Sequence, residues 1–241
     1  GVPTIHEFLK NNLKNDMCLG FDGRTVSESE AEELKNLLKG KNIHFSVEED
    51  LIGEIWEDRP ELSCEPVMEL EVKWAGETRA SKIARIRQQM KEEGADIFIL
   101  TSLDDIAWLL NIRGNDIHCC PVVLSYLIMT EKEIKLFANE KAFQEKVRRN
   151  LEADSVRIHP YNEVYAYAQK INKEQNVLIS EKCVNSRLVS SIPENVTILD
   201  RPNPTLLAKA VKNPVEMENE RIAHIKDGVA VTKFIHWMKT K

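Results

Sequence analysis

One segment of the sequence, residues 103–121, gathers most of the side chains that could recognise or position a ligand. It reads LDDIAWLLNIRGNDIHCCP, with an apolar centre at Trp108 and the two leucines after it. Carboxylates, amides and an imidazole at this density indicate either a recognition surface or an internal hydrogen-bond network. The polar members are Asp104, Asp105, Asn111, Arg113, Asn115, Asp116 and His118.

Arg113 is the residue of this segment best suited to bind an anion or a carbonyl group. Its guanidinium is a planar fork of donors that matches a carboxylate. Gly114 follows it, and a glycine after a helix end permits a left-handed turn that presents the arginine outward. The alternative is structural, with Arg113 paired to Asp104, Asp105 or Asp116. The residues alone leave both interpretations open.

Two adjacent cysteines, Cys119 and Cys120, directly follow His118, an order that could serve a metal or redox site. We interpret them instead as two small buried residues at the start of a strand, since free cysteines are among the most buried residue types. The chain has five cysteines and no C-x-x-C motif. An odd count without regular spacing argues against a disulfide framework and fits a reducing cytoplasm.

Motifs of several other functional classes are absent. The sequence has no H-E-x-x-H of zinc peptidases, no G-x-S-x-G of serine hydrolases and no glycine-rich phosphate loop. Its formal net charge of −6 speaks against a nucleic-acid partner. No apolar run approaches the roughly 20 residues that cross a bilayer. We therefore expect neither metal ligands nor a nucleic-acid or membrane partner for these residues.

The elements that must position residues 103–121 alternate between helix and strand. This alternation, with one antiparallel hairpin at 121–138, predicts an α/β fold with a mixed β-sheet flanked by helices. Residues 58–77 contain Pro60 and Pro66 and are typical of a linker. Apolar spacing predicts helices over 4–13, 27–39, 82–93, 104–110, 161–173 and 183–190, and strands over 17–21, 43–47, 96–101, 121–130, 134–138, 155–158, 176–180 and 196–199.

The chain also repeats itself once. Residues 4–56 and 161–211 follow the same order of helix, strand, helix, strand and apolar tail, which predicts two related units. The second unit has a full front half in residues 80–158, and we expect the first to lack its own. Residues 213–216 (NPVE) are a strong helix start. We expect the helix that begins there to belong to a third body.

Several motifs together resemble the three-domain Xaa-Pro aminopeptidases (aminopeptidase P). The resemblance covers essentially the whole chain, and residues 213–216 and 221–230 (RIAHIKDGVA) look like the first helix of that family's catalytic domain. The other matching motifs are residues 56–60 (WEDRP), 74–76 (WAG), 103–117 (LDDIAWLLNIRGNDI) and 120–122 (CPV).

The resemblance implies two successive creatinase/prolidase N-terminal domains of ribonuclease H-like fold, followed by a pita-bread catalytic domain. It divides the chain into the back half of the first domain (1–58), a linker (59–78), the complete second domain (79–207) and the first helix of the catalytic domain (208–241). In this family the catalytic domain binds two divalent metal ions, usually manganese, and hydrolyses the bond between an N-terminal residue and proline. None of its five ligands has a match here, so we expect this chain alone to be inactive.

In relatives, the segment that matches residues 108–116 lies toward the mouth of the active site, and in some dimeric relatives it reaches the neighbouring subunit. The resemblance thus implies a cytoplasmic homodimer that acts on peptides with proline at the second position. The family commonly has Asn where this chain has Cys120. If that Asn orients the loop or a ligand, its role is either lost here or taken by His118 or Asn115. The candidates for shaping substrate access are Trp108, Asn111, Arg113, Asp116 and His118.

Two other functions stay open at this level. The same folds recur as inactive peptide-binding or histone-binding modules, although this sequence has no acidic tail. Prolidases and creatinases share the domain but usually have one copy of it, so the repeated unit favours the three-domain enzyme. Metal ligands in the downstream sequence would decide between an enzyme and a binding module.

Overall fold

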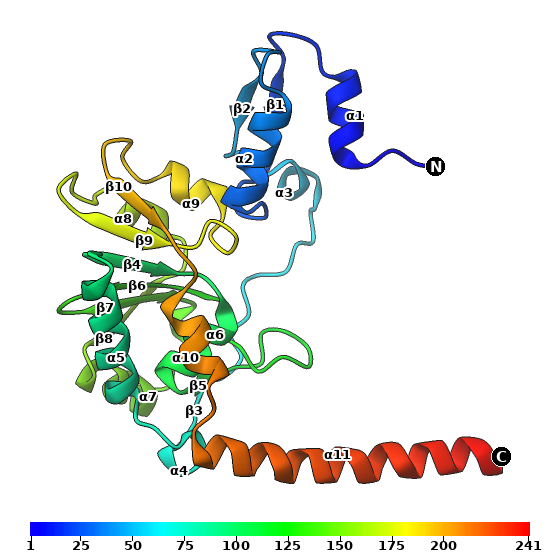
Figure 1. Ribbon diagram of the computed structural model, residues 1–241, viewed down its shortest axis with the longest axis vertical. Helices are drawn as coiled ribbons and strands as arrows, with labels where there is room; N and C mark the ends of the chain where they lie inside the picture. The colour runs from blue at the N-terminus through cyan, green and yellow to red at the C-terminus, as the bar shows by residue number, and fades with distance from the viewer.

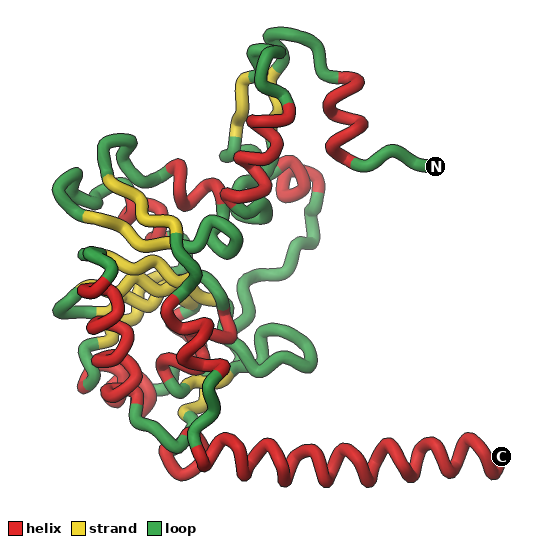
Figure 2. Tube along the Cα trace, in the orientation of Figure 1, coloured by secondary structure: helices red, strands yellow, loops and turns green.

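The computed structural model describes residues 1–241 and arranges them in three parts. A small lobe at the N-terminus stands beside a larger body built on a six-stranded sheet, and a long helix projects from the body at the C-terminus (Figure 1). An extended connection leads from the lobe to the body, and the lobe and the long helix lie on opposite ends of the body (Figure 2).

The body contains a mixed sheet with strand order β10-β9-β4-β6-β7-β8. The pairs β4–β6 and β6–β7 are antiparallel, and the remaining pairs are parallel. The predicted α/β fold with a mixed sheet is thereby confirmed. The strands are β4 (Ile97–Leu100), β6 (Ser125–Thr130), β7 (Ile134–Ala138), β8 (Val156–Pro160), β9 (Asn176–Ile179) and β10 (Thr197–Asp200).

Helices cover both faces of this sheet, which explains why its central strands are apolar throughout. In β4, Phe98 and Leu100 join one hydrophobic cluster while Ile97 and Ile99 join the other, as expected from the two-residue period of a strand. The first face packs against α5 (Arg79–Glu92), α6 (Leu103–Leu110), α7 (Glu145–Ala153) and α10 (Pro204–Ala210). The second packs against α8 (Glu163–Ala168) and α9 (Ser186–Ser190).

The N-terminal lobe has a much smaller core. Its two strands, β1 (Cys18–Gly20) and β2 (His44–Ser46), pair in parallel with each other and with no further strand. Among its apolar side chains only Ala31, Leu34 and Leu38 are buried. Its helices are α1 (Ile5–Asn12), α2 (Glu28–Leu37) and α3 (Leu51–Ile55).

Lobe and body meet through reciprocal backbone hydrogen bonds at the starts of α2 and α9. The amide of Glu28 donates to the carbonyl of Val184 at 2.9 Å, and the amide of Ser186 donates to the carbonyl of Val26 at 2.9 Å. Ser27 and Asn185, which cap the two helices, form an antiparallel bridge. Equivalent positions of the repeated pattern thus face each other, as in a two-fold interface.

The segment predicted as a linker is extended only in its first half. From Val67, which is 3% exposed, the chain packs onto the body. It forms β3 (Met68–Glu69), antiparallel to β5 (Ile112–Arg113), and the short helix α4 (Val72–Ala75). Two-residue strands leave no periodic signal, so this small sheet could not be predicted from apolar spacing.

Three other expectations differ from the structure. The strand predicted over 121–130 starts only at Ser125. The helix predicted over 161–173 spans Glu163–Ala168, because Lys170 and Ile171 turn back with amide bonds to residues three positions earlier. Asn139 is also a candidate N-cap in the sequence for a helix that runs through Asn150, but the structure has a turn of 3-10 helix, η1 (Glu140–Ala142), before α7.

The last helix, α11 (Pro214–Thr240), begins with a capping box. Asn213 Oδ1 accepts from the amides of Val215 and Glu216, both at 3.0 Å, and Glu216 Oε2 accepts from the amide of Asn213 at 3.0 Å. No residue of α11 is buried. No helix in the structure combines the length and the apolar character needed to span a membrane.

Candidate functional site

The candidate segment is positioned by α6, which ends in a tight turn at Asn111. This residue adopts the left-handed conformation (φ 50°, ψ 42°), which asparagine tolerates better than most residues. Its side chain is enclosed, accepts from Lys82 Nζ at 2.7 Å and donates to the carbonyl of Glu77 at 2.9 Å. Asn111 therefore fixes the turn from the inside and does not face a ligand.

Three cations cap the last turn of α6. Lys82 Nζ, Arg79 Nε and Arg113 Nη1 each donate to a carbonyl group within residues 107–110, at 2.9, 2.6 and 2.9 Å. The final carbonyls of a helix lack intrahelical donors and carry negative partial charge, so cations are favoured there. Neither Lys82 nor Arg79 was singled out from the sequence. Lys82 begins the helix predicted over 82–93, whereas Arg79 precedes that prediction and starts the observed α5.

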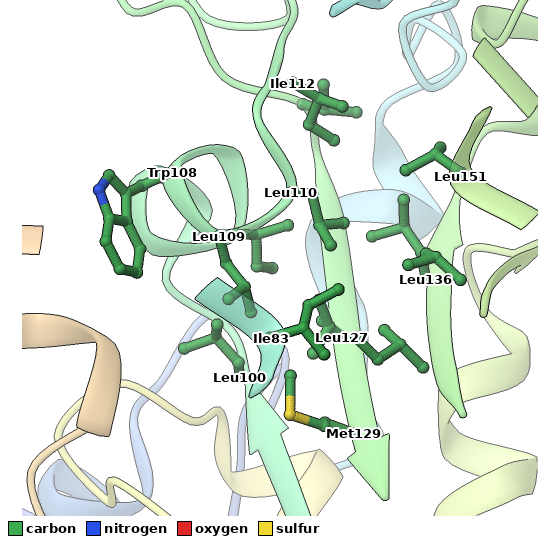
Figure 3. Packing of buried hydrophobic residues seen from close by; sticks show 14 of the residues in the cluster. Ile83, Leu100, Trp108, Leu109, Leu110, Ile112, Leu127, Met129, Leu136 and Leu151 are labelled. Atoms are coloured by element: carbon green, nitrogen blue, oxygen red, sulfur yellow. The ribbon is translucent and has the colours of Figure 1, made fainter. Parts of the chain in front are cut away.

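Trp108 is part of the hydrophobic core rather than of the surface. It is 6% exposed and belongs to the larger cluster, at whose edge its indole lies (Figure 3). The ring is flanked by two cations, with Lys82 Nζ 4.5 Å and the Arg85 guanidinium carbon 5.5 Å from its centroid. Such cation–π contacts stabilise the cations by about 0.5–2 kcal/mol when desolvated. Trp108 can thus act on a ligand only through the residues that it packs against.

Burial lowers the pKa of two cations at the end of α6, Lys82 and Arg113. Burial lowers the pKa of Lys82 to about 8. The carboxylates of Glu216 and Glu77 oppose this shift, and the charges of Arg113 and Arg85 add to it. Burial also lowers the pKa of Arg113, which as a guanidinium stays protonated. The last turn of α6 therefore holds a surplus of positive charge beside the start of α11.

Asp116 and His118 lie in a loop that projects from the body between β5 and β6 (Figure 1). Its base is held by Asp116 Oδ2, which accepts from the amide of Leu124 at 2.7 Å. At Gly114 a β-carbon would lie 2.7 Å from the carbonyl oxygen of Val122, so the two arms of the loop touch. His118 is exposed at the tip. The other oxygen of Asp116, Oδ1, is buried without a partner.

The other end of α6 is bound to α10. The carboxylate of Asp105, 2% exposed, accepts from Thr205 Oγ1 at 2.9 Å and pairs with Lys209 Nζ at 2.6 Å. Asn203 Nδ2 donates to Ser102 Oγ at 2.8 Å. Asp105 therefore forms a structural ion pair. Its partner is Lys209 of α10 and not Arg113, the partner considered from the sequence.

A second joint holds the start of α11 against α4. Asn213 Nδ2 donates to the carbonyl of Ala75 at 2.8 Å, and Asn219 Nδ2 donates to that of Trp74 at 3.1 Å. Gly76 is left-handed (φ 71°), and a β-carbon on it would lie 2.2 Å from Asn213 Oδ1. Only glycine meets both demands. The joint fixes the direction in which α11 leaves the body.

The structure thus brings three of the five predicted residues together and leaves two apart. Trp108, Asn111 and Arg113 surround the end of α6, where Arg113 is half-buried and the other two are enclosed. Asp116 and His118 belong to the projecting loop. No three His, Cys, Asp or Glu side chains converge on a possible metal position anywhere in residues 1–241. These residues do not fit a di-metal centre.

The profile of the creatinase/prolidase N-terminal domain matches residues 58–216. The chain belongs to this family. The match includes the six-stranded sheet, α6 and the projecting loop, so the fold expected from the resemblance is confirmed.

Relatives with curated names are similar over almost the entire chain. Xaa-Pro aminopeptidase 1 of Dictyostelium discoideum is 33% identical, with 99% of this chain and 39% of that protein covered. A probable Xaa-Pro aminopeptidase P of Laccaria bicolor is also 33% identical, with 99% of this chain and 38% of that protein covered. The chain therefore spans about two fifths of the length of these relatives.

A solved structure shows the same arrangement of parts. The X-prolyl aminopeptidase of Caenorhabditis elegans, described as a cytosolic enzyme with a di-nuclear active site, superposes with a TM-score of 0.89 at 32% identity. The superposition covers 99% of this chain and 40% of the enzyme. The chain is homologous to the N-terminal part of metal-dependent Xaa-Pro aminopeptidases.

Proposed function

We propose that this chain is the non-catalytic N-terminal part of a metal-dependent Xaa-Pro aminopeptidase. The observation that carries the proposal is the match to the Caenorhabditis elegans enzyme, which includes lobe, body and long helix in one superposition. The complete protein would hydrolyse the bond between an N-terminal residue and proline in the cytoplasm. Its di-metal centre, with manganese as the expected metal, would lie in the three fifths of the relatives that this chain does not match.

We further propose that the four parts of the chain are the back half of a first domain (1–58), a linker (59–78), a complete second domain (79–207) and the start of the catalytic domain (208–241). The reciprocal bonds between the starts of α2 and α9 support two related domains. The exposed apolar side chains of α11, such as Ile225 at 67% and Trp237 at 54%, support a helix that packs into a further body.

The role proposed for the second domain is to shape access to the active site. Arg113 has one edge fixed on the end of α6, which leaves the rest of its fork available to a peptide carbonyl or carboxylate. Asp116 and His118 would line the approach from the projecting loop. Trp108 and Asn111 would position Arg113 from the core. A homodimer, as implied for the family, would place this surface near a second subunit.

Activity assays on two lengths of protein test the assignment. We expect the 241-residue chain to release no N-terminal residue from an Xaa-Pro peptide in the presence of Mn²⁺, and the complete protein to release it. Turnover by the 241-residue chain alone, in a preparation free of other peptidases, would contradict the proposal that this part is non-catalytic. A complete protein without turnover on any Xaa-Pro peptide would favour a peptide-binding module.

A substitution in the complete protein tests the access role. Arg113→Lys keeps the charge but loses the fork, and we expect kcat/KM to fall about tenfold, equivalent to ~1.4 kcal/mol. Arg149→Lys is the matched control, because Arg149 lies on α7 and pairs only with Glu145. Equal kcat/KM values in both variants would reject a role for Arg113.

A further inference from the structure

The tip of the projecting loop carries two thiols next to each other. The expectation that Cys119 and Cys120 are buried at a strand start is wrong, since both are exposed and β6 begins only at Ser125. They lie beyond the point where Asp116 and Gly114 hold the two arms of the loop. The pair is therefore open to solvent, on the loop that projects from the body between β5 and β6 (Figure 2).

The backbone at this tip is an unusual place for a cysteine. The amide of Cys120 donates to the carbonyl of Ile117 at 3.0 Å, which closes a four-residue turn. Cys119 occupies the third position with φ 60°, where glycine or asparagine is preferred because a β-carbon is disfavoured. Residues held in such regions cost on the order of 1–3 kcal/mol and cluster at functional positions.

The remaining cysteines lack such a neighbour. All three are exposed and free, and none is adjacent to another cysteine in sequence: Cys18, Cys64 and Cys183. A small oxidant can therefore form only an adduct with each of them. At Cys119–Cys120 the second thiol is available to displace the adduct, because exchange requires attack of a thiolate on a nearby disulfide sulfur.

We propose that Cys119 and Cys120 form a redox-active vicinal dithiol that is oxidised by small-molecule disulfides of the glutathione class. One cysteine, as thiolate, attacks the disulfide; its bond to the small thiol forms while the other half leaves as a thiol. The neighbouring thiolate then attacks the protein sulfur of this mixed disulfide and expels the second small thiol. Two protein thiols are oxidised to one disulfide, and one small-molecule disulfide is reduced to two thiols. This inference does not depend on the aminopeptidase assignment.

Formation of a disulfide between Cys119 and Cys120 should leave the rest of the fold unchanged. The contacts that hold the loop base involve Gly114, Asp116, Val122 and Leu124, and none involves a thiol. The change would be confined to the turn that also presents His118. Oxidation would thus alter the shape and polarity of the loop tip without unfolding the body.

Differential alkylation of a variant that keeps only this pair tests the proposal. The background is Cys18→Ser, Cys64→Ser and Cys183→Ser, all at exposed positions. The folded chain is treated with oxidised glutathione, then with iodoacetamide, and the loop peptide is analysed by mass spectrometry. We expect a peptide that carries neither glutathione nor an alkyl group, and that takes up two alkyl groups after reduction.

Two further variants in the same background serve as controls. Cys119→Ser and Cys120→Ser should each retain one glutathione, since no second thiol can displace it. A glutathione that persists on the intact pair, or two thiols that remain open to alkylation, would overturn the proposal. A circular dichroism spectrum that is unchanged on oxidation is expected, and loss of helical signal would contradict the confinement to the loop tip.

Discussion

The two repeated units of the molecule share an order of elements but differ in what surrounds their strands. In the second unit, β9 lies between β10 and β4, and Val177, Leu178 and Ile179 are fully buried. In the first unit, β1 pairs with β2 alone, and none of its three residues is buried. The same local pattern thus yields a core strand in one place and a half-exposed strand in the other.

This difference distinguishes features that depend on the local sequence of a unit from features that depend on adjacent strands. Both units start their second helix with a side-chain cap, Ser27 in α2 and Asn185 in α9, and both present the same backbone groups to each other. Turns and caps are local and therefore recur. Burial depends on adjacent strands, and a two-stranded sheet alone is marginally stable.

The largest expected effect comes from truncating equivalent strands. Leu178→Ala removes a side chain with no exposed surface from the larger cluster, and we expect it to lower the free energy of unfolding by about 2–5 kcal/mol. Leu19→Ala in β1 removes a half-buried side chain and should cost about 1 kcal/mol. Urea unfolding measures both. Similar losses in the two variants would mean that β1 is as enclosed as β9.

A buried charge in the body gives the next largest effect. The pKa of Lys82 in the folded chain is lowered to about 8 by burial, from an ordinary value of 10.5. Since the unfolded chain binds the proton more tightly, this group makes stability rise between about pH 8 and pH 10.5, by up to about 3 kcal/mol. Below about pH 8 the buried amine is protonated in the folded chain as well, and this gain in the free energy of unfolding is lost.

Lys82→Met should abolish this part of the pH dependence. The measurement is the difference in unfolding free energy between variant and wild type at several pH values from 7 to 11. We expect the difference to shift in favour of wild type as the pH rises. The variant Lys91→Met, at an exposed position of the same helix, should show no such trend. A flat difference for Lys82→Met would mean that its amine is solvated.

The contact between the two units can be broken at a single glycine. A β-carbon at Gly23 would lie 2.7 Å from the carbonyl oxygen of Val47 and 2.9 Å from the amide of Arg187. Gly23→Ala should therefore cost about 1–3 kcal/mol through overpacking and speed hydrogen exchange at Ser186 and Arg187. At Gly20 the nearest atom is 3.4 Å away, so Gly20→Ala is the control. An unchanged rate of amide exchange at Ser186 and Arg187 in Gly23→Ala would mean that the lobe shifts to accept the β-carbon and keeps its hydrogen bonds to the body.

Local patterns made most of the body predictable. The run at 96–101 and the hairpin at 121–138 gave the central strands β4, β6 and β7 from apolar period and turn residues alone. The sheet β3–β5 could not be found this way, because each of its strands has two residues and its pairing joins positions far apart in sequence. The strand order likewise follows from packing rather than from any one segment.

The sequence could nominate a candidate segment but not the contacts of its side chains. Polar density singled out residues 103–121, and the structure places Arg113 half-buried at the end of α6 and the loop tip on the surface. The burial of Trp108 and Asn111 depends on Lys82 and Arg79, which reach α6 from another helix. A polar side chain in a motif looks the same in sequence whether it faces a ligand or caps a helix from within.

The smallest effect concerns a buried carboxylate of the first unit. Burial raises the pKa of Glu28, although Lys35 Nζ lies 3.7 Å away and opposes the shift. A raised pKa means that the folded chain favours the protonated acid, so the stability it contributes is present below the ordinary value of 4.5 and is lost as the pH rises through the folded value. At the equivalent position the second unit has the neutral Ser186, which is buried without a charge.

Glu28→Gln should therefore raise the free energy of unfolding at neutral pH, by less than about 1 kcal/mol, and the gain should vanish below pH 4. Glu30→Gln is the control, since Glu30 is exposed on the same helix turn and its loss weakens the favourable interaction of an anion with the helix N-terminus. Urea unfolding at pH 7 and pH 4 compares them. A loss of stability in Glu28→Gln at neutral pH would mean that the pair with Lys35 outweighs desolvation, and that the first unit tolerates a buried charge by pairing it.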